Sequence, residues 1–145
     1  MLLSIITINY NNAQGLEKTL KSALSQTCTE FEHVIVDGAS TDNVVEIIQQ
    51  YEKDAVACGI KVVWVSEKDK GIYNAMNKGI KMASGEYIQI LNSGDCLAAD
   101  TVVADMYSAL KEKEYPEILY GNMLKTVDWK TYQRDDRGAN SEYTS

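Results

Sequence analysis

The chain has 145 residues and a formal net charge of −7, because 21 Asp and Glu outnumber 14 Lys and Arg. This length normally forms one domain, and a hydrophobic fraction of 45% excludes wholesale disorder. The isoelectric point near 4.7 argues against a nucleic-acid-binding surface, which needs clustered Lys and Arg.

The cysteines and the N-terminus indicate an intracellular protein. Cys28, Cys58 and Cys96 lie too far apart for C-x-x-C chemistry, and with the single His33 they cannot form a tetrahedral zinc site. We expect three free thiols in a reducing compartment. The N-terminus lacks the basic region of a signal peptide, and no run approaches the roughly 20 apolar residues of a membrane span. We therefore expect a cytoplasmic domain without a transmembrane segment, either free or peripheral at the inner face of a membrane.

Strand-like and helix-like stretches alternate along most of the chain. Apolar, β-branched runs predict buried strands, and apolar residues at helical spacing predict the helices between them. In chain order, strands are expected at 2–8, 33–36, 61–65, 86–91 and 117–120, and helices at 16–24, 44–51, 71–83 and 101–111. Four consecutive βα units imply an α/β fold, with a mainly parallel sheet and helices on both faces. The periodicity fades after Gly121, and an irregular tail is expected over residues 122–145.

Polar residues collect where the predicted strands end. The first, second, third and fourth strands lead into Asn9–Asn12, Asp37–Asp42, Ser66–Gly71 and Asn92–Asp95. Each run alone is ordinary turn chemistry. Because ligands of open parallel sheets bind outside the carboxyl ends of the strands, four such runs on one rim predict a ligand site.

The runs SIITINYNN, HVIVDGASTD, EKDKGIYNAMNKGI and ASGEYIQILNSGD occur in register. Together they resemble the nucleotide-sugar-binding half of family 2 glycosyltransferases with the GT-A fold. The resemblance implies a Rossmann-like twisted sheet in the strand order 3-2-1-4, incomplete at the C-terminus. It further implies a donor-binding subdomain over residues 1–121, with 122–145 as the start of a missing or truncated acceptor region.

The implied activity is inverting, metal-assisted transfer of a sugar in polysaccharide biosynthesis. The donor would be a nucleotide-diphospho-sugar, namely a UDP- or GDP-sugar, and the acceptor a hydroxyl of a glycan or lipid-linked molecule. A sheet flank left uncovered by a missing half would favour a homo-oligomer.

The resemblance also assigns the nucleoside end of the site. Tyr10 supplies a stacking face for the base, and Asn11 fixes the loop beside it. Asp37 resembles the acid that accepts a hydrogen bond from the base or ribose, while capping of the second helix falls better to residues 40–42. Many relatives carry a second Asp where this chain has Gly38, which leaves the division of roles between the two positions open.

Further donor-binding residues follow the third and fourth strands. Lys70 and Gly71 open the third predicted helix, where backbone N–H groups and a cation could meet the nucleotide. Asn77 on the polar side of that helix and Ser93 complete the implied set.

The run Asn92–Asp95 occupies the place of the acidic, metal-binding motif of the family. A Mg²⁺ or Mn²⁺ ion bridging the diphosphate needs hard oxygen ligands. Asn92 and Gly94 replace carboxylates, so Asp95 is expected to be the metal-binding acid, with the diphosphate and water filling the other positions.

No residue is assigned as the general base that an inverting transfer needs. In relatives this carboxylate lies well beyond the metal motif. Asp128, Asp135 and Asp136 are the tail acids considered for this role, and they are interpreted as solvated surface charges.

Two other function classes compete with a transferase. A non-catalytic nucleotide-sugar-binding module, or an inactive fragment of a longer enzyme, would carry the same donor motifs, and turnover would distinguish it from an enzyme. A receiver-like signalling domain would use Asp37 as a phosphoacceptor. That fold needs paired acids after its first strand, where this chain has Asn9, Asn11 and Asn12.

Overall fold

The computed structural model describes residues 3–115, 123–127, 130–134 and 140–144. The chain divides into two compact units, residues 1–104 and 105–145, and each is considered by itself. Within the described ranges, no helix is long and apolar enough to cross a membrane.

The first unit is built on a parallel four-stranded sheet. Its strands are β1 (Leu3–Asn9), β2 (Phe31–Asp37), β3 (Lys61–Ser66) and β4 (Tyr87–Ile90), and their order is β3-β2-β1-β4. All three pairings are parallel, with Asn9 opposite Asp37 and Asp37 opposite Ser66. The predicted order 3-2-1-4 is therefore confirmed, and the loops after β2 and β4 flank the end of β1.

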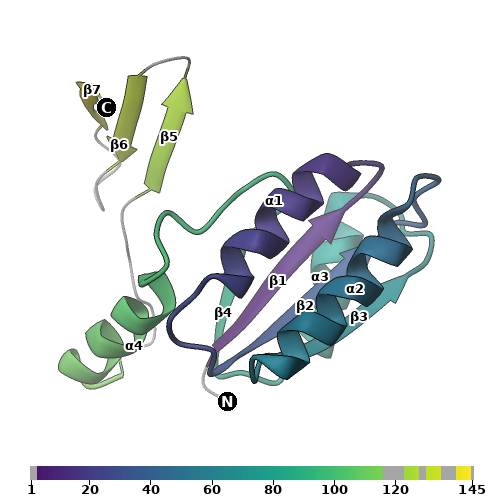
Figure 1. The fold of residues 1–145 in the computed structure, drawn as a ribbon, viewed down its shortest axis with the longest axis horizontal. Coiled ribbons are helices and arrows are strands. Elements are labelled where there is room, and N and C mark those ends of the chain that lie inside the picture. Colours follow the sequence, from purple (N-terminus) through teal and green to yellow (C-terminus); the bar gives the residue numbers. More distant parts are fainter. Residues whose placement is uncertain (1–2, 116–122, 128–129, 135–139, 145) are drawn as a thin grey trace. The chain divides into compact units, whose positions relative to one another are not determined.

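Helices cover both faces of this sheet, as predicted. They are α1 (Ala13–Leu24), α2 (Val44–Ala57) and α3 (Ile72–Met82), while α4 (Val102–Glu112) follows the fourth strand. Figure 1 shows α1 and α2 on one face of the sheet and α3 on the other. Both central strands are almost wholly buried, which explains why β1 and β2 are rich in β-branched apolar residues, while the polar residues among them make hydrogen bonds within the core.

Helix α3 packs against the sheet through two small residues, Ala75 and Gly79. Ala75 belongs to a buried cluster with Ile6, Val34 and Val36. At Gly79 an added Cβ would lie 2.5 Å from Ile6 Cγ2, far inside normal contact distance. The absence of a side chain at position 79 therefore sets the separation between α3 and β1.

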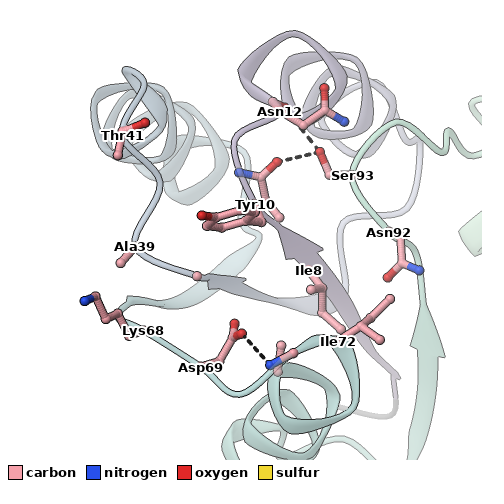
Figure 2. Close-up of a pocket in the computed structure, with 14 residues that line it drawn as sticks. Ile8, Tyr10, Asn12, Ala39, Thr41, Lys68, Asp69, Ile72, Asn92 and Ser93 are labelled. Carbon is pink, nitrogen blue, oxygen red and sulfur yellow. Dashed lines mark hydrogen bonds between the residues drawn. The ribbon is translucent and has the colours of Figure 1, made fainter.

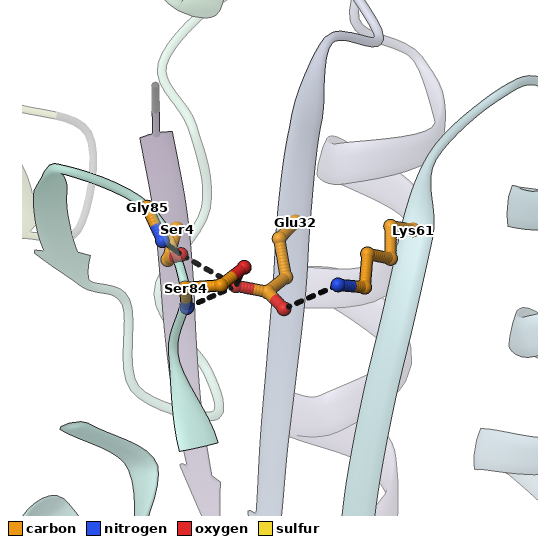
Figure 3. Close-up of polar contacts among 5 residues, drawn as sticks. All are labelled: Ser4, Glu32, Lys61, Ser84 and Gly85. Carbon is orange, nitrogen blue, oxygen red and sulfur yellow. Dashed lines mark hydrogen bonds and ion pairs between the residues drawn. The ribbon is translucent and has the colours of Figure 1, made fainter. Parts of the chain in front are cut away.

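A buried carboxylate ties the loop after α3 to the amino ends of the central strands (Figure 3). Glu32 Oε2 accepts hydrogen bonds from Ser4 Oγ at 2.6 Å and from the Ser84 backbone N–H at 2.8 Å, and Oε1 lies 3.5 Å from Lys61 Nζ. Burial alone would raise the pKa of Glu32, but these hydrogen bonds and Lys61 outweigh it, so the pKa lies below its usual value. Ser4 Oγ in turn accepts from the Gly85 N–H at 2.8 Å, which fixes the start of β4.

A second polar contact crosses the core on the side of α2. His33 is fully buried, with Nε2 2.7 Å from Thr7 Oγ1 and Nδ1 2.6 Å from Tyr51 Oη. Burial lowers the pKa of His33 to about 3 and raises that of Tyr51. The imidazole is thus a neutral hydrogen-bonding link between β1, β2 and α2.

The expectation of an irregular tail is wrong for the described part of the second unit. Three short antiparallel strands, β5 (Met123–Val127), β6 (Lys130–Arg134) and β7 (Asn140–Thr144), form a sheet in that order. Each contains Val, Thr or Tyr, which favour strands, but each is only five residues long and interrupted by charged or amide residues. Such segments give no clear hydrophobic period, and the structure defines them by their antiparallel pairing with one another. The fifth strand predicted at 117–120 lies outside the described residues.

Candidate functional site

A cavity of about 700 Å³ opens at the carboxyl ends of the parallel strands (Figure 2). It lies within the first unit and is lined by the end of β1, the loops after β1, β2, β3 and β4, and the first turn of α3. Its lining residues are Ile8, Asn9, Tyr10, Asn12, Gly38, Ala39, Thr41, Lys68, Asp69, Gly71, Ile72, Ala75, Asn92 and Ser93. The rim predicted from the four polar runs is therefore the place where this cavity forms.

Tyr10, Gly38 and Asp69 meet on one side of the cavity. The Tyr10 side chain is 66% exposed although it directly follows a buried strand. Figure 2 shows Asp69 below the Tyr10 ring, with its carboxylate directed toward it. A Cβ at Gly38 would lie 2.9 Å from Asp69 Oδ2 and 3.1 Å from Tyr10 Cδ1. An exposed aromatic face thus stands beside a carboxylate, and the glycine leaves room for both.

Asp37 lies beneath this surface and does not line the cavity. It is fully buried, and Oδ1 accepts from Asn9 Nδ2 at 3.0 Å and from Ser40 Oγ. Oδ2 accepts from the Ser40 N–H at 3.0 Å and from Ser66 Oγ at 2.7 Å. Burial alone would raise the pKa of Asp37, but the bonds from Ser40, Ser66 and Asn9 outweigh it and lower the pKa. Asp37 therefore positions the loops, and its burial leaves a phosphoacceptor role without support.

The contacts of Asp37 are part of a row that joins all four strands. Ser93 Oγ, after β4, donates to Asn9 Oδ1 at 2.7 Å, and Asn9 donates to Asp37. Ser66, the last residue of β3, completes the row from the other edge. We call Ser93, Asn9, Asp37 and Ser66 the rim row. Sequence reasoning singled out Asp37 and Ser93 but not Asn9 and Ser66, which look like ordinary strand-end residues.

Asn11 and the 40–42 segment connect the loops after β1 and β2. Asn11 has a left-handed backbone (φ 45°), which Asn tolerates better than most residues. Its N–H donates to Ser40 Oγ at 2.8 Å, and its Oδ1 accepts from the Thr41 N–H at 2.8 Å. Asp42 accepts a hydrogen bond from the Ala13 N–H.

The expectation that residues 40–42 cap the second helix is wrong: Asn43 is the N-cap and makes no side-chain cap bond. The polar cluster serves the loop after β1 instead.

Of the residues predicted at the third helix, Gly71 lines the cavity whereas Lys70 and Asn77 are exposed and do not. Gly71 is the N-cap of α3 with φ 117°, a conformation that favours glycine, and its N–H donates to Asp69 Oδ1 at 3.0 Å. The Lys70 N–H donates to Asn74 Oδ1 at 3.0 Å. The loop before α3 is therefore folded back onto the first turn of the helix.

The loop after β4 presents Asn92 and Ser93 to the cavity. Asn92 Oδ1 is a buried acceptor without a hydrogen-bond partner among the described residues. Asp95 is exposed and does not line the cavity, and its backbone carbonyl accepts from Thr19 Oγ1 at 2.6 Å. No group of three or more His, Cys, Asp or Glu that could hold a metal ion occurs among the described residues. The oxygen donors on this side are thus the Asn92 amide and the Asp95 carboxylate.

Asp69 and Asn92 were missed as cavity residues by sequence reasoning. Asp69 lies in the run EKDKG, where it is one of several charges typical of a surface loop. The signal that the sequence offered for Asp69 was Gly38. A glycine in place of the second Asp leaves space next to the loop after β2, and Asp69 from the loop after β3 occupies that space.

Comparison with known proteins connects this site to one family. The model of the glycosyl transferase family 2 matches residues 4–144. An uncharacterised glycosyltransferase of Mycobacterium tuberculosis is 38% identical over 120 residues, which are 82% of this chain and 44% of the relative. A PGL/p-HBAD biosynthesis glycosyltransferase of Mycobacterium bovis is 32% identical over 123 residues, 85% of this chain and 47% of the relative. The chain thus spans less than half the length of these relatives.

A solved structure agrees with the fold. Residues 1–349 of Staphylococcus aureus TarS in complex with UDP-GlcNAc superimpose with a TM-score of 0.68 and 28% identity, over 79% of this chain and 32% of that TarS chain. The GT-A arrangement expected from the four motifs is confirmed, and the chain belongs to glycosyl transferase family 2.

Proposed function

We propose that this chain is the donor-binding part of an enzyme that transfers a sugar from a nucleotide-diphospho-sugar to a hydroxyl of a glycan or lipid-linked acceptor. The observation that carries the proposal is the cavity at the carboxyl ends of β1–β4, with an exposed Tyr10 ring at one side and the start of α3 at another. The exposed ring offers a stacking surface for a planar base, and the helix start offers N–H groups for a diphosphate. Membership of the family and the UDP-GlcNAc complex of TarS support the same assignment.

Within this proposal the base lies against Tyr10 and the diphosphate toward the first turn of α3. The first N–H groups of a helix have no partner inside the helix and attract anions. Gly71 and Ile72 at this helix start line the cavity. Lys70 does not line the cavity, but its positive charge at the same helix start would attract the diphosphate at longer range. The donor-binding subdomain would comprise residues 1–121.

The residues after β4 suit a Mg²⁺ or Mn²⁺ ion bound mainly by the donor. Asn92 Oδ1 is an amide oxygen with no hydrogen-bond partner in the part of the chain that the structure describes, and Asp95 adds a carboxylate three residues later. Mg²⁺ is commonly held by one or two protein oxygens together with substrate phosphates and water. The ion would offset negative charge on the departing nucleoside diphosphate.

In this proposal, the residues that bind the acceptor lie beyond the donor motifs in the sequence. An inverting transfer needs a base that removes the acceptor proton, and none of the cavity residues is assigned this role. Asp128, Asp135 and Asp136 lie outside the described residues.

Two measurements test the proposal: calorimetric titration with nucleoside diphosphates, and an assay for consumption of the nucleotide sugar. We expect UDP or GDP to bind, and the corresponding nucleotide sugar to be consumed when the acceptor is supplied. Nucleotide binding without turnover by an enzyme of full family length would favour a non-catalytic binding module. Absence of binding by every nucleoside diphosphate would contradict the proposal.

A further inference from the structure

The carboxylate of Asp69 has one oxygen that is used by the protein and one that is not. Oδ1 accepts from the Gly71 N–H at 3.0 Å, which fixes the side chain at the start of α3. Oδ2 has no hydrogen-bond partner among the described residues, and Asp69 lines the cavity. The carboxylate is thus oriented by the backbone and still has acceptor capacity directed into the cavity.

The position of this free oxygen is set by Gly38 and Tyr10. A side chain at position 38 would begin 2.9 Å from Asp69 Oδ2 and 3.1 Å from the Tyr10 ring. Asp69 therefore fills the space that any side chain from the β2 loop would otherwise occupy (Figure 2). Asp37, the neighbouring acid in sequence, cannot serve here, because it is fully buried and both of its oxygens accept hydrogen bonds.

A carboxylate beside an aromatic face discriminates between bases by the atoms at their edges. Tyr10 and Asp69 line the same cavity and both lie next to Gly38, so the carboxylate borders the space that a base stacked on Tyr10 would occupy. The carboxylate accepts hydrogen bonds and cannot donate them. The N3–H of uracil satisfies it, whereas cytosine places an unprotonated N3 acceptor at the same position.

We propose that Asp69 is the base-recognising residue of this site and selects a uracil nucleotide over a cytosine nucleotide. This inference rests on the proposed function, since it takes a nucleoside diphosphate as the ligand. The contribution of one hydrogen bond to a charged group corresponds to about tenfold to hundredfold in affinity. We therefore expect UDP to bind at least about tenfold more tightly than CDP.

The substitution Asp69→Asn tests this inference by inverting the hydrogen-bonding character of one atom. The amide keeps an oxygen for the Gly71 N–H and replaces Oδ2 with an NH₂ donor, which suits cytosine N3 and opposes uracil N3–H. We expect the UDP-to-CDP affinity ratio, measured by calorimetry, to fall by about tenfold or more. Glu67→Gln is the matched control: Glu67 is exposed in the same loop, pairs with Lys78 and does not line the cavity. Its ratio should equal that of the parent.

A second measurement uses the unaltered protein, in case Asp69→Asn impairs folding. N3-methyl-UDP has the uracil ring but no N3–H, and we expect it to bind the parent about tenfold or more weakly than UDP. Equal binding of UDP and N3-methyl-UDP by the parent, or an unchanged UDP-to-CDP ratio in folded Asp69→Asn, would overturn this inference alone. If the parent binds no nucleoside diphosphate, the proposed function is overturned and this inference with it.

Discussion

Asp37 and Asp69 show how burial separates two acids that look alike in the sequence. Asp37 follows a strand in a motif that points to function, yet its four hydrogen bonds are all made within the protein. Asp69 lies in a charged loop, yet it faces the cavity. The positions of the motifs thus predict where the site lies. Which of the two acids faces the ligand, however, is decided by the free space next to Gly38, which Asp69 occupies.

A substitution at Tyr10 should affect nucleotide affinity much more than the stability of the fold. Because its side chain is 66% exposed, Tyr10→Ala should change the free energy of unfolding little. Stacking of a base on an aromatic ring contributes about 1–3 kcal/mol, so nucleotide affinity should fall roughly fivefold to hundredfold. Calorimetric titration with UDP or GDP measures this. Tyr73→Ala is the control, since Tyr73 is 80% exposed on α3 and does not line the cavity. Equal nucleotide affinity in Tyr10→Ala and the parent would remove Tyr10 from the site.

Asp95 tests the proposed metal dependence. Asp95→Asn keeps the size of the side chain but removes the carboxylate that lies three residues after Asn92 in the loop after β4. If a cation joins this loop to the diphosphate, Mn²⁺ should strengthen nucleotide binding by the parent, and the mutant should lose most of that effect, about 1.5–3 kcal/mol. Titrations with and without Mn²⁺ decide between the outcomes. Asp100→Asn, five residues later and also exposed, should respond to Mn²⁺ as the parent does. The same Mn²⁺ response in Asp95→Asn would contradict a metal role for this carboxylate.

At the level of elements, the spacing between α3 and the sheet positions the start of the helix at the cavity. Gly79→Ala should improve helix propensity by up to about 1 kcal/mol. The new methyl group, however, would begin 2.5 Å from Ile6 Cγ2 in a packed core, and overpacking of this kind typically costs about 1–3 kcal/mol. We therefore expect a net loss of stability in denaturant unfolding. Nucleotide affinity should also fall, because Gly71 and Ile72 move with the helix.

Asn77→Ala provides the control on the same helix. Asn77 is exposed, so its replacement should raise stability slightly through propensity alone. A Gly79→Ala protein as stable as the parent would show that α3 can shift without cost.

The elements differ in how far the sequence predicts them. Strands β1 and β2 and the periodic helices are visible in the sequence because most of their buried positions carry apolar residues, and the presence and order of these elements were expected correctly, although β2 begins at Phe31 and α2 extends to Ala57. Helix α1 begins at Ala13 rather than near Leu16, because Asn12 Oδ1 accepts from the Gly15 N–H and starts the helix earlier than its apolar face. Strands β5–β7 were missed because pairing, which sequence periodicity does not report, defines them. The sequence predicted the edge of the sheet at which the site lies. It did not predict the contacts of Asn9, Ser66 and Asp69, because these depend on the register of the strands and on the packing of the loops.

For the whole molecule, His33 couples stability to pH. Its pKa is about 3 in the folded protein and near 6.5 in the unfolded chain, so the unfolded state binds more protons between these values. Stability is therefore fully present above about pH 6.5 and is lost as the pH falls below it. Between pH 7 and 5 the loss should be about 2 kcal/mol. The lowered pKa values of Asp37 and Glu32 act at lower pH, where the unfolded carboxyls begin to protonate.

Denaturant unfolding at several pH values measures this effect, and His33→Gln should flatten the dependence between pH 7 and 5. Because the chain contains one histidine, its imidazole proton resonances can also be followed without ambiguity. A titration of His33 near pH 6.5 in the native protein would contradict the prediction.

The rim row also has a consequence for the order in which the chain is synthesised. Its bonds join residues 28, 29 and 84 positions apart, the last between Asn9 and Ser93. A nascent chain that has emerged only through β3 can close the Asn9–Asp37–Ser66 part, but it lacks the donor that holds the other side of Asn9. The cavity can then be completed only after the fourth βα unit has begun to form, when nearly two thirds of these 145 residues have been made. Ligand binding by ribosome-bound chains of increasing length should consequently begin abruptly once Ser93 has left the exit tunnel, rather than grow with each added strand.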